Sequence, residues 1–203
     1  MDFETGQYSE AYHGSLGDIS SLEYDGDFFY AAGIHRIYKI DAETGNEVYG
    51  EDVGHNIDNL AMAPDGILYG TQSSKLIIVD KENGNITEIG NINVSGVSAL
   101  AIDRNGRALA CADASEPFIE INLSDASFTP LGDISQFWDA FDFGPDGNLY
   151  GWSYSDLYRI DIDAVTYTHI GHYSRSGEGF AVVPEPATLL LLGLGAVMLI
   201  KRL

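Results

Sequence analysis

Short apolar runs separated by polar turns repeat along most of this chain, with a period of about 40 residues. Apolar runs flank every turn, as in LAMAPDGILYG from Leu60 and FDFGPDGNLYG from Phe141. This alternation is the sequence pattern of a β-hairpin. Four of the turns hold an acidic or polar residue followed by glycine, and these glycines are Gly26, Gly66, Gly106 and Gly147.

A third and a fourth apolar run follow each hairpin, as in IYKIDAETGNEVYG and LIIVDKENGNITEIG. Each unit therefore holds four short strands, and almost no segment has the period of a helix. Four strands in about 40 residues is typical of a β-propeller blade. A sandwich or an up-and-down barrel does not require such a regular repeat. We predict an all-β fold, a β-propeller with four complete four-stranded blades, over residues 1–183.

Both ends of the repeat region contain part of a fifth blade. Residues 2–6 match residues 41–45, where a third strand ends, and Phe180 lies 39 residues after Phe141, where a first strand begins. These pieces supply the innermost and the outermost strand of a blade, but not the two strands between them. We therefore expect a partial fifth blade and an incomplete N-terminus, so that only a longer chain would close the propeller.

Composition and charge narrow the class of protein. The 203 residues are 45% hydrophobic, which is enough for a packed core and excludes a disordered chain. Lys and Arg number 10 against 31 Asp and Glu, and the net charge of −21 argues against a nucleic-acid partner. A single cysteine, Cys111, excludes an internal disulfide framework.

The last 20 residues differ in composition from the repeats. Pro184, Glu185 and Pro186 precede an apolar segment from Ala187 to Ile200, and Lys201 and Arg202 end it. Leu192 and Gly195 lie inside the apolar segment. It predicts a short hydrophobic helix of about 21 Å, less than the roughly 30 Å of a bilayer core. The basic pair is expected to stay cytoplasmic.

This arrangement resembles the PEP-CTERM sorting signal of Gram-negative envelope proteins. The resemblance implies that residues 184–203 are a sorting and transmembrane tail, recognised by an exosortase at the inner membrane. It also implies cleavage near the Pro-Glu-Pro motif and delivery to the cell surface or an extracellular matrix. A weak anchor or a buried core helix is the alternative. Export requires an N-terminal signal, and residues 1–20 hold no apolar run, which again favours an incomplete N-terminus.

Candidate ligands for a cation lie in loops that precede the innermost strands. Asp58, Asp139 and Glu178 would meet at the mouth of a central channel and hold a divalent cation such as Ca²⁺ through oxygen atoms. The alternative is that these are solvated acidic loops, because no calcium-loop spacing is present. The turns between second and third strands, with His35, Arg36, Tyr154 and Asp156, are expected on the same face.

Other repeated residues are expected to be structural. The acidic or amide side chain after each third strand caps a tight turn, and the turn glycines cradle no phosphate because no helix follows them. Tyr30, Tyr69, Tyr150 and Trp152 are predicted to pack between blades. The capping positions are Asp41, Asp80, Asn122 and Asp161.

The sequence favours a non-enzymatic protein that binds or scaffolds at the cell envelope. Its partner would be an exopolysaccharide, a small ligand or another surface protein. No Ser-His-Asp arrangement can be recognised, and we predict no catalytic residue. The alternative is a metal-dependent, lactonase-like hydrolase with its site at the channel mouth, using Asp58, Asp139 or Glu178 as ligands or base.

Overall fold

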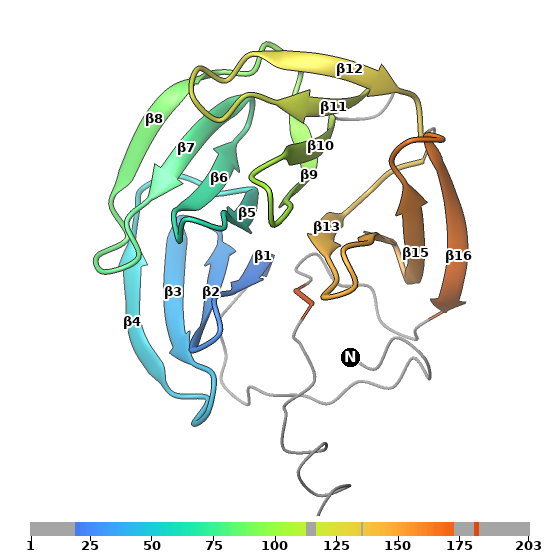
Figure 1. The fold of residues 1–203 in the computed structure, drawn as a ribbon. Coiled ribbons are helices and arrows are strands. Elements are labelled where there is room, and N and C mark those ends of the chain that lie inside the picture. The colour runs from blue at the N-terminus through green and yellow to red at the C-terminus, as the bar shows by residue number, and fades with distance from the viewer. Residues whose placement is uncertain (1–18, 113–116, 135, 173–180, 183–203) are drawn as a thin grey trace, which may run out of the picture.

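The computed structural model describes residues 19–112, 117–134, 136–172 and 181–182. These residues form four antiparallel sheets of four strands each, and the strands of each sheet follow one another in chain order. The sheets succeed one another around an arc, so that the first and the fourth blade lie at its two ends (Figure 1). The predicted all-β propeller arrangement with four four-stranded blades is confirmed.

The sixteen strands are short and nearly equal in length. The first blade comprises β1 (Ile19–Tyr24), β2 (Phe28–Gly33), β3 (Arg36–Asp41) and β4 (Glu47–Asp52), and the second β5 (Asn59–Met62), β6 (Leu68–Gln72), β7 (Lys75–Val79) and β8 (Ile86–Asn91). The third blade comprises β9 (Val97–Ile102), β10 (Ala108–Ala112), β11 (Phe118–Ile121) and β12 (Phe128–Gly132), and the fourth β13 (Ala140–Phe143), β14 (Leu149–Ser153), β15 (Asp156–Asp161) and β16 (Thr166–His172).

The first strand of each blade lies innermost and the fourth lies at the rim (Figure 1). The inner strands β1, β5, β9 and β13 contact one another in that order. The described residues contain no helix, and so none that is long and apolar enough to cross a membrane. The predicted fifth-blade pieces at residues 2–6 and Phe180 and the predicted tail helix, residues 184–203, lie outside the described residues.

Turn chemistry explains why each blade folds back on itself. The glycine of the first hairpin turn has a positive φ in every blade, for example +83° at Gly66, a conformation that favours glycine. After the third strand, the predicted caps are confirmed. The Thr44 amide donates to Asp41 Oδ1 at 2.8 Å, and the Ser124 amide donates to Asn122 Oδ1 at 3.0 Å.

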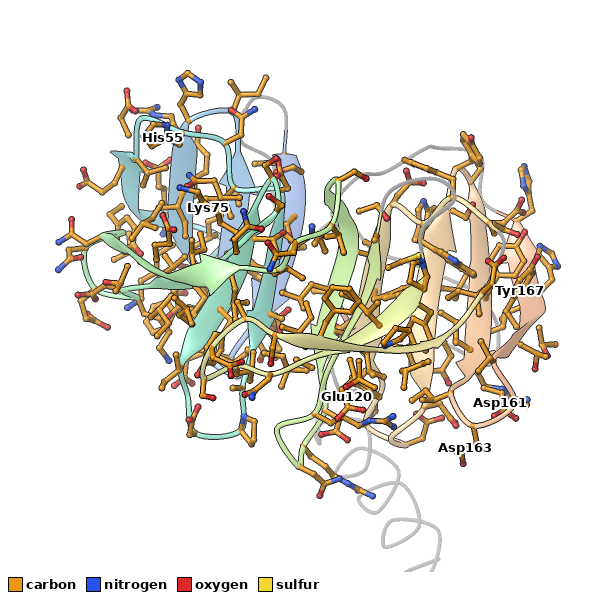
Figure 2. The ribbon with its side chains drawn as sticks, turned by 90° about the horizontal axis from the view of Figure 1, so that it is seen from above. His55, Lys75, Glu120, Asp161, Asp163 and Tyr167 are labelled. Carbon is orange, nitrogen blue, oxygen red and sulfur yellow. The ribbon has the colours of Figure 1, made fainter. Side chains whose placement is uncertain are left out.

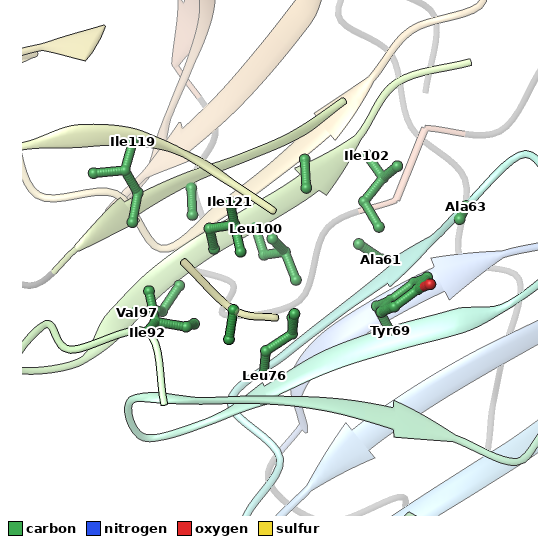
Figure 3. Close-up of a cluster of buried hydrophobic side chains, with 13 residues drawn as sticks. Ala61, Ala63, Tyr69, Leu76, Ile92, Val97, Leu100, Ile102, Ile119 and Ile121 are labelled. Carbon is green, nitrogen blue, oxygen red and sulfur yellow. The ribbon is translucent and has the colours of Figure 1, made fainter. Parts of the chain in front are cut away.

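Apolar side chains fill the space between neighbouring blades. One cluster joins the second and third blades, where Tyr69 and Leu76 face Leu100 and Ile119 (Figure 3). Tyr30 and Tyr69 pack between blades as predicted, because their clusters include residues of the following blade. Tyr150 and Trp152 are also buried, in a cluster formed by the fourth blade and Val182. Cys111 is buried as well.

Polar bonds tie the inner strands of adjacent blades together. Ser21 Oγ on β1 accepts a hydrogen bond from the Leu60 amide on β5 at 2.8 Å. Asn59 Nδ2 in turn donates to the Val97 carbonyl on β9 at 2.8 Å. Both bonds are buried, where the partner groups would cost about 1–3 kcal/mol if left unpaired. These bonds fix the register between the blades on which the site geometry depends.

Candidate binding sites

The strands leave two distinct ends on which loops gather. We call the loop end the one that carries the connections between blades and the turns between second and third strands. The glycine-turn end carries the first hairpin turns and the turns between third and fourth strands. Figure 2 shows His55 at the loop end, and Asp161 and Asp163 at the glycine-turn end.

Asp58 and Asp139 occupy equivalent positions at the loop end, each directly before the inner strand of its blade. Asp58 Oδ2 accepts a hydrogen bond from the Ser73 amide, and Asp139 Oδ2 accepts one from the Tyr154 amide, both at 2.5 Å. Ser73 and Tyr154 have φ values of +58° and +54°. Each carboxylate thus stabilises a left-handed residue in the turn that follows the second strand.

The local environment of Asp139 differs from that of a free carboxylate. Burial raises the pKa of Asp139, and the hydrogen bond from the Tyr154 amide counteracts this rise. The cause of this shift is the burial of the carboxyl group. It does not by itself indicate a bound ion.

The described residues do not test whether the three predicted cation ligands meet. Asp58 belongs to the second blade and Asp139 to the fourth, while Glu178 lies outside the described residues. Within the described part of the chain, no group of three or more His, Cys, Asp or Glu side chains is arranged to hold a metal ion. The cation site at the channel mouth remains a prediction.

A hollow of about 600 Å³ opens at the loop end around the second blade. It brings His35 and Asp58 into one site, as the prediction that they share a face requires. His55 and Lys75, labelled in Figure 2, lie in the same hollow. The residues that line this loop-end hollow are His35, His55, Asn56, Asp58, Gln72, Ser73, Lys75, Ser95, Gly96 and Val97.

Two details of the loop-end hollow were not predicted from sequence. The Gln72 side-chain nitrogen, Nε2, is buried and has no hydrogen-bond partner among the described residues. Lys75 Nζ pairs with Glu88 Oε2 at 2.7 Å, and both side chains are about half exposed. Only the register of β6 with β7 shows that Gln72 and Lys75 lie opposite each other.

A second hollow of about 540 Å³ lies at the glycine-turn end. Glu23 from β1 and Asp142 from β13 line it, together with apolar Met62 and Ile102 from the inner strands between them. Glu23 and Asp142 occupy equivalent strand positions, since Glu23 pairs with Tyr30 and Asp142 with Tyr150. The first and the fourth blade thus each direct a carboxyl group toward this hollow.

Both carboxyl groups are shifted toward the protonated form. Burial, reinforced by the charge of Asp142, raises the pKa of Glu23 well above its ordinary value. Burial raises the pKa of Asp142 to about 7, although the amides of Val182 and Phe143 donate to its carboxylate and oppose the rise. This pair could not be predicted from the sequence, because nothing in the repeat indicates which blades approach each other.

Aromatic and histidine side chains also gather at the loop end of the fourth blade. Phe137 and Tyr154 are exposed, and their ring centroids lie 5.9 Å apart. Trp138, in the same loop, is fully buried. His169 Nε2 and His172 Nδ1 lie 3.1 and 2.9 Å from Asp156 Oδ1, a cluster that the sequence did not predict.

One segment of the chain matches a known family of sequence motifs. Residues 182–202 match the PEP-CTERM protein-sorting motif. The chain carries a PEP-CTERM sorting motif behind a β-propeller-like region. The motif implies exosortase processing and export toward the cell surface. No curated protein matches the sequence closely enough to count as a relative.

Solved structures resemble this chain in fold alone. Hydrazine synthase from Kuenenia stuttgartiensis superposes with a TM-score of 0.55 at 17% identity, over 83% of this chain and 52% of that one. A streptogramin B lyase superposes with a TM-score of 0.54 at 15% identity, over 79% of this chain and 57% of that one. This chain therefore spans little more than half the length of either protein.

Proposed function

We propose that this chain is an exported binding or scaffolding protein of the cell surface or extracellular matrix. The observation that supports the proposal is the PEP-CTERM motif at residues 182–202, directly behind the propeller blades. In this proposal, the apolar segment from Ala187 to Ile200 holds the protein transiently at the inner membrane. An exosortase then cleaves near Pro184–Pro186 and releases the propeller outward.

The loop end is the surface that we assign to binding. It holds a polar hollow at the second blade and an exposed aromatic pair, Phe137 and Tyr154, at the fourth. Aromatic faces and polar side chains on one surface suit ligands with both ring faces and hydroxyl groups. An exopolysaccharide or another surface protein is the partner class that fits an exported protein of this kind.

The alternative, a metal-dependent hydrolase at the channel mouth, would use Asp58, Asp139 and Glu178 with a divalent cation such as Ca²⁺. The capping bonds of Asp58 and Asp139 to turn amides favour the binding protein, because they give both carboxylates a structural task. Stoichiometric binding of a divalent ion, measured by calorimetry, would instead favour the hydrolase.

Localisation in a host that carries an exosortase tests the proposed function. The chain, preceded by a secretion signal, should reach the cell surface, as measured by surface proteolysis and fractionation. Replacing Pro184, Glu185 and Pro186 together by alanine should retain the protein at the inner membrane. Pro145→Ala, at a turn of the fourth blade, is the matched control and should not change export. Equal export of both variants would refute sorting by this motif.

A further inference from the structure

The loop-end hollow is built by three blades. His35 comes from the first blade, Gln72 and Lys75 from the second, and Ser95 from the connection to the third. Its volume of about 600 Å³ lies within the range of small-molecule sites in proteins. A ligand held here would contact elements whose relative position is fixed by the buried bonds between the inner strands.

Hydrogen-bond donors dominate the lining of this hollow. The Gln72 amide is the most informative, because its buried Nε2 has no partner in the described part of the chain. A buried donor without a partner costs about 1–3 kcal/mol, and an acceptor atom on a ligand would remove that cost. Asn56, His55 and Lys75 bring further nitrogen atoms to the same hollow.

The charge of this hollow differs from that of the whole chain, which carries a net charge of −21. Lys75, His35 and His55 line it, and Asp58 is the one acidic side chain among the described lining residues. Asp58 already accepts a bond from the Ser73 amide. An anionic group therefore meets less repulsion here than elsewhere on an acidic surface.

Lys75 is available to a ligand even though it is paired. Its partner Glu88 does not line the hollow, and both side chains are about half exposed. Exposed ion pairs of this kind contribute only about 0–1 kcal/mol. A ligand carboxylate can therefore compete with Glu88 for Lys75 at small cost.

We propose that the loop-end hollow binds a carboxylate-bearing saccharide. The carboxylate would pair with Lys75 and accept from Gln72, while Asn56, Ser73 and Asp58 match the donors and acceptors of sugar hydroxyl groups. The described lining residues include no Phe, Tyr or Trp, which disfavours a planar apolar ligand. This proposal rests on the binding role proposed above and specifies the chemical class of the ligand.

Calorimetry on the 203-residue chain in mild detergent tests the proposal. The probes are a disaccharide that ends in glucuronate and the same disaccharide with its carboxyl group reduced to the alcohol, in 0.15 M salt to screen the long-range charge. We expect the acid to bind at least about 10-fold more tightly, the effect of one charge-assisted hydrogen bond. Equal affinity for the two sugars, or no binding at millimolar concentration, would overturn the proposal.

Four substitutions locate the site. Gln72→Leu and Lys75→Gln should each weaken binding of the acid about 10-fold. Lys81→Gln, the same change of charge at the glycine-turn end, is the matched control and should leave binding unchanged. Glu88→Gln should tighten binding about 2- to 5-fold by freeing Lys75, a gain that a folding defect cannot imitate.

The pattern of results separates this proposal from the proposed function. If Lys81→Gln weakens binding as much as Lys75→Gln, only the overall charge matters and the assigned site is wrong. If Glu88→Gln fails to tighten binding, Lys75 does not hold the carboxylate. Failure of the sugar to bind leaves the export experiment unaffected. Failure of export likewise leaves the measured affinity intact.

Discussion

Glu23 on β1 and Asp142 on β13 place two carboxyl groups at the same hollow from the first and the last described blade. The second and third blades carry alanine at the equivalent position, Ala61 and Ala101. The Val182 amide also donates to Asp142 Oδ2. This pair therefore lies where Val182 meets the fourth blade.

Removing one charge from this pair should stabilise the protein at high pH. The folded state keeps Asp142 protonated up to about pH 7, whereas an unfolded aspartate loses its proton near pH 4. The free energy of unfolding is therefore unaffected by the charge of Asp142 below about pH 4, where the carboxyl group is protonated in both states. It falls as the pH rises through 7, because the folded state must then hold a buried charge. Asp142→Asn should raise the free energy of unfolding by about 1–3 kcal/mol at pH 8 and leave it unchanged at pH 4.

Urea unfolding at both pH values measures this effect. Asp163→Asn, at the turn between β15 and β16 (Figure 2), is a control with the same change in an exposed carboxylate. It should not alter the dependence of stability on pH. A gain for Asp142→Asn that is equal at pH 4 and pH 8 would show that charge at this position is not the cause.

Substitutions can distinguish two roles of Asp58, that of a turn cap and that of a metal ligand. If it only caps the turn, Asp58→Asn keeps an oxygen acceptor for the Ser73 amide and should retain most stability. Asp58→Ala should lose about 1 kcal/mol. Melting temperatures with and without 1 mM Ca²⁺ provide the measurement. We expect no shift with Ca²⁺ in any form, and a shift in wild type that Asp58→Asn abolishes would establish Asp58 as a cation ligand.

Gly151 is required by the packing of the fourth blade. A Cβ atom at this position would lie 2.6 Å from Trp138 Cζ3 and 2.9 Å from Ile160 Cδ1. Trp138 is fully buried, and its Nε1 donates to the Ile134 carbonyl at 3.2 Å, so it has little room to move. Gly151→Ala should lower the free energy of unfolding by about 1–3 kcal/mol.

A double-mutant cycle with Trp138→Phe checks this cause. The smaller ring makes space for the new methyl group, so the two losses should not add, and a coupling of about 1 kcal/mol or more is expected. Simple additivity in chemical unfolding would show that the contact with Trp138 is not the origin of the loss.

The division into propeller and tail predicts that the two parts are separable. A chain ending at residue 183 should be more soluble than the full chain and keep the same fold, because all strands of the four described blades lie before residue 173. Circular dichroism and thermal unfolding of the truncated chain test this. Loss of cooperative unfolding would contradict the division at residues 183 and 184.

The repeat allowed the blades to be predicted because each strand is encoded locally. The glycine turns and the caps at Asp41 and Asn122 lie at equivalent places in successive units, so local chemistry sets every hairpin. The burial of Tyr30 and Tyr150 followed from the same register. These features need no knowledge of how the blades face each other.

The sites depend on contacts between blades, which the repeat does not encode. Glu23 and Asp142 differ from alanine at the same strand position, but their approach is set by the curvature of the whole arc. The unpartnered Gln72 amide is likewise visible only once three blades surround it. The burial of Trp138 likewise depends on aromatic packing against Phe141, Tyr158 and Tyr167.

The mass of the protein recovered from the cell surface tests most directly whether the tail sorts the propeller. In a host with an active exosortase, the mature chain should end near Pro184–Pro186 and lack the residues from Ala187 to Leu203. Mass spectrometry of its C-terminal peptide would identify that end. Surface protein that still carries Lys201, Arg202 and Leu203 would show that the tail is not processed and would contradict this account.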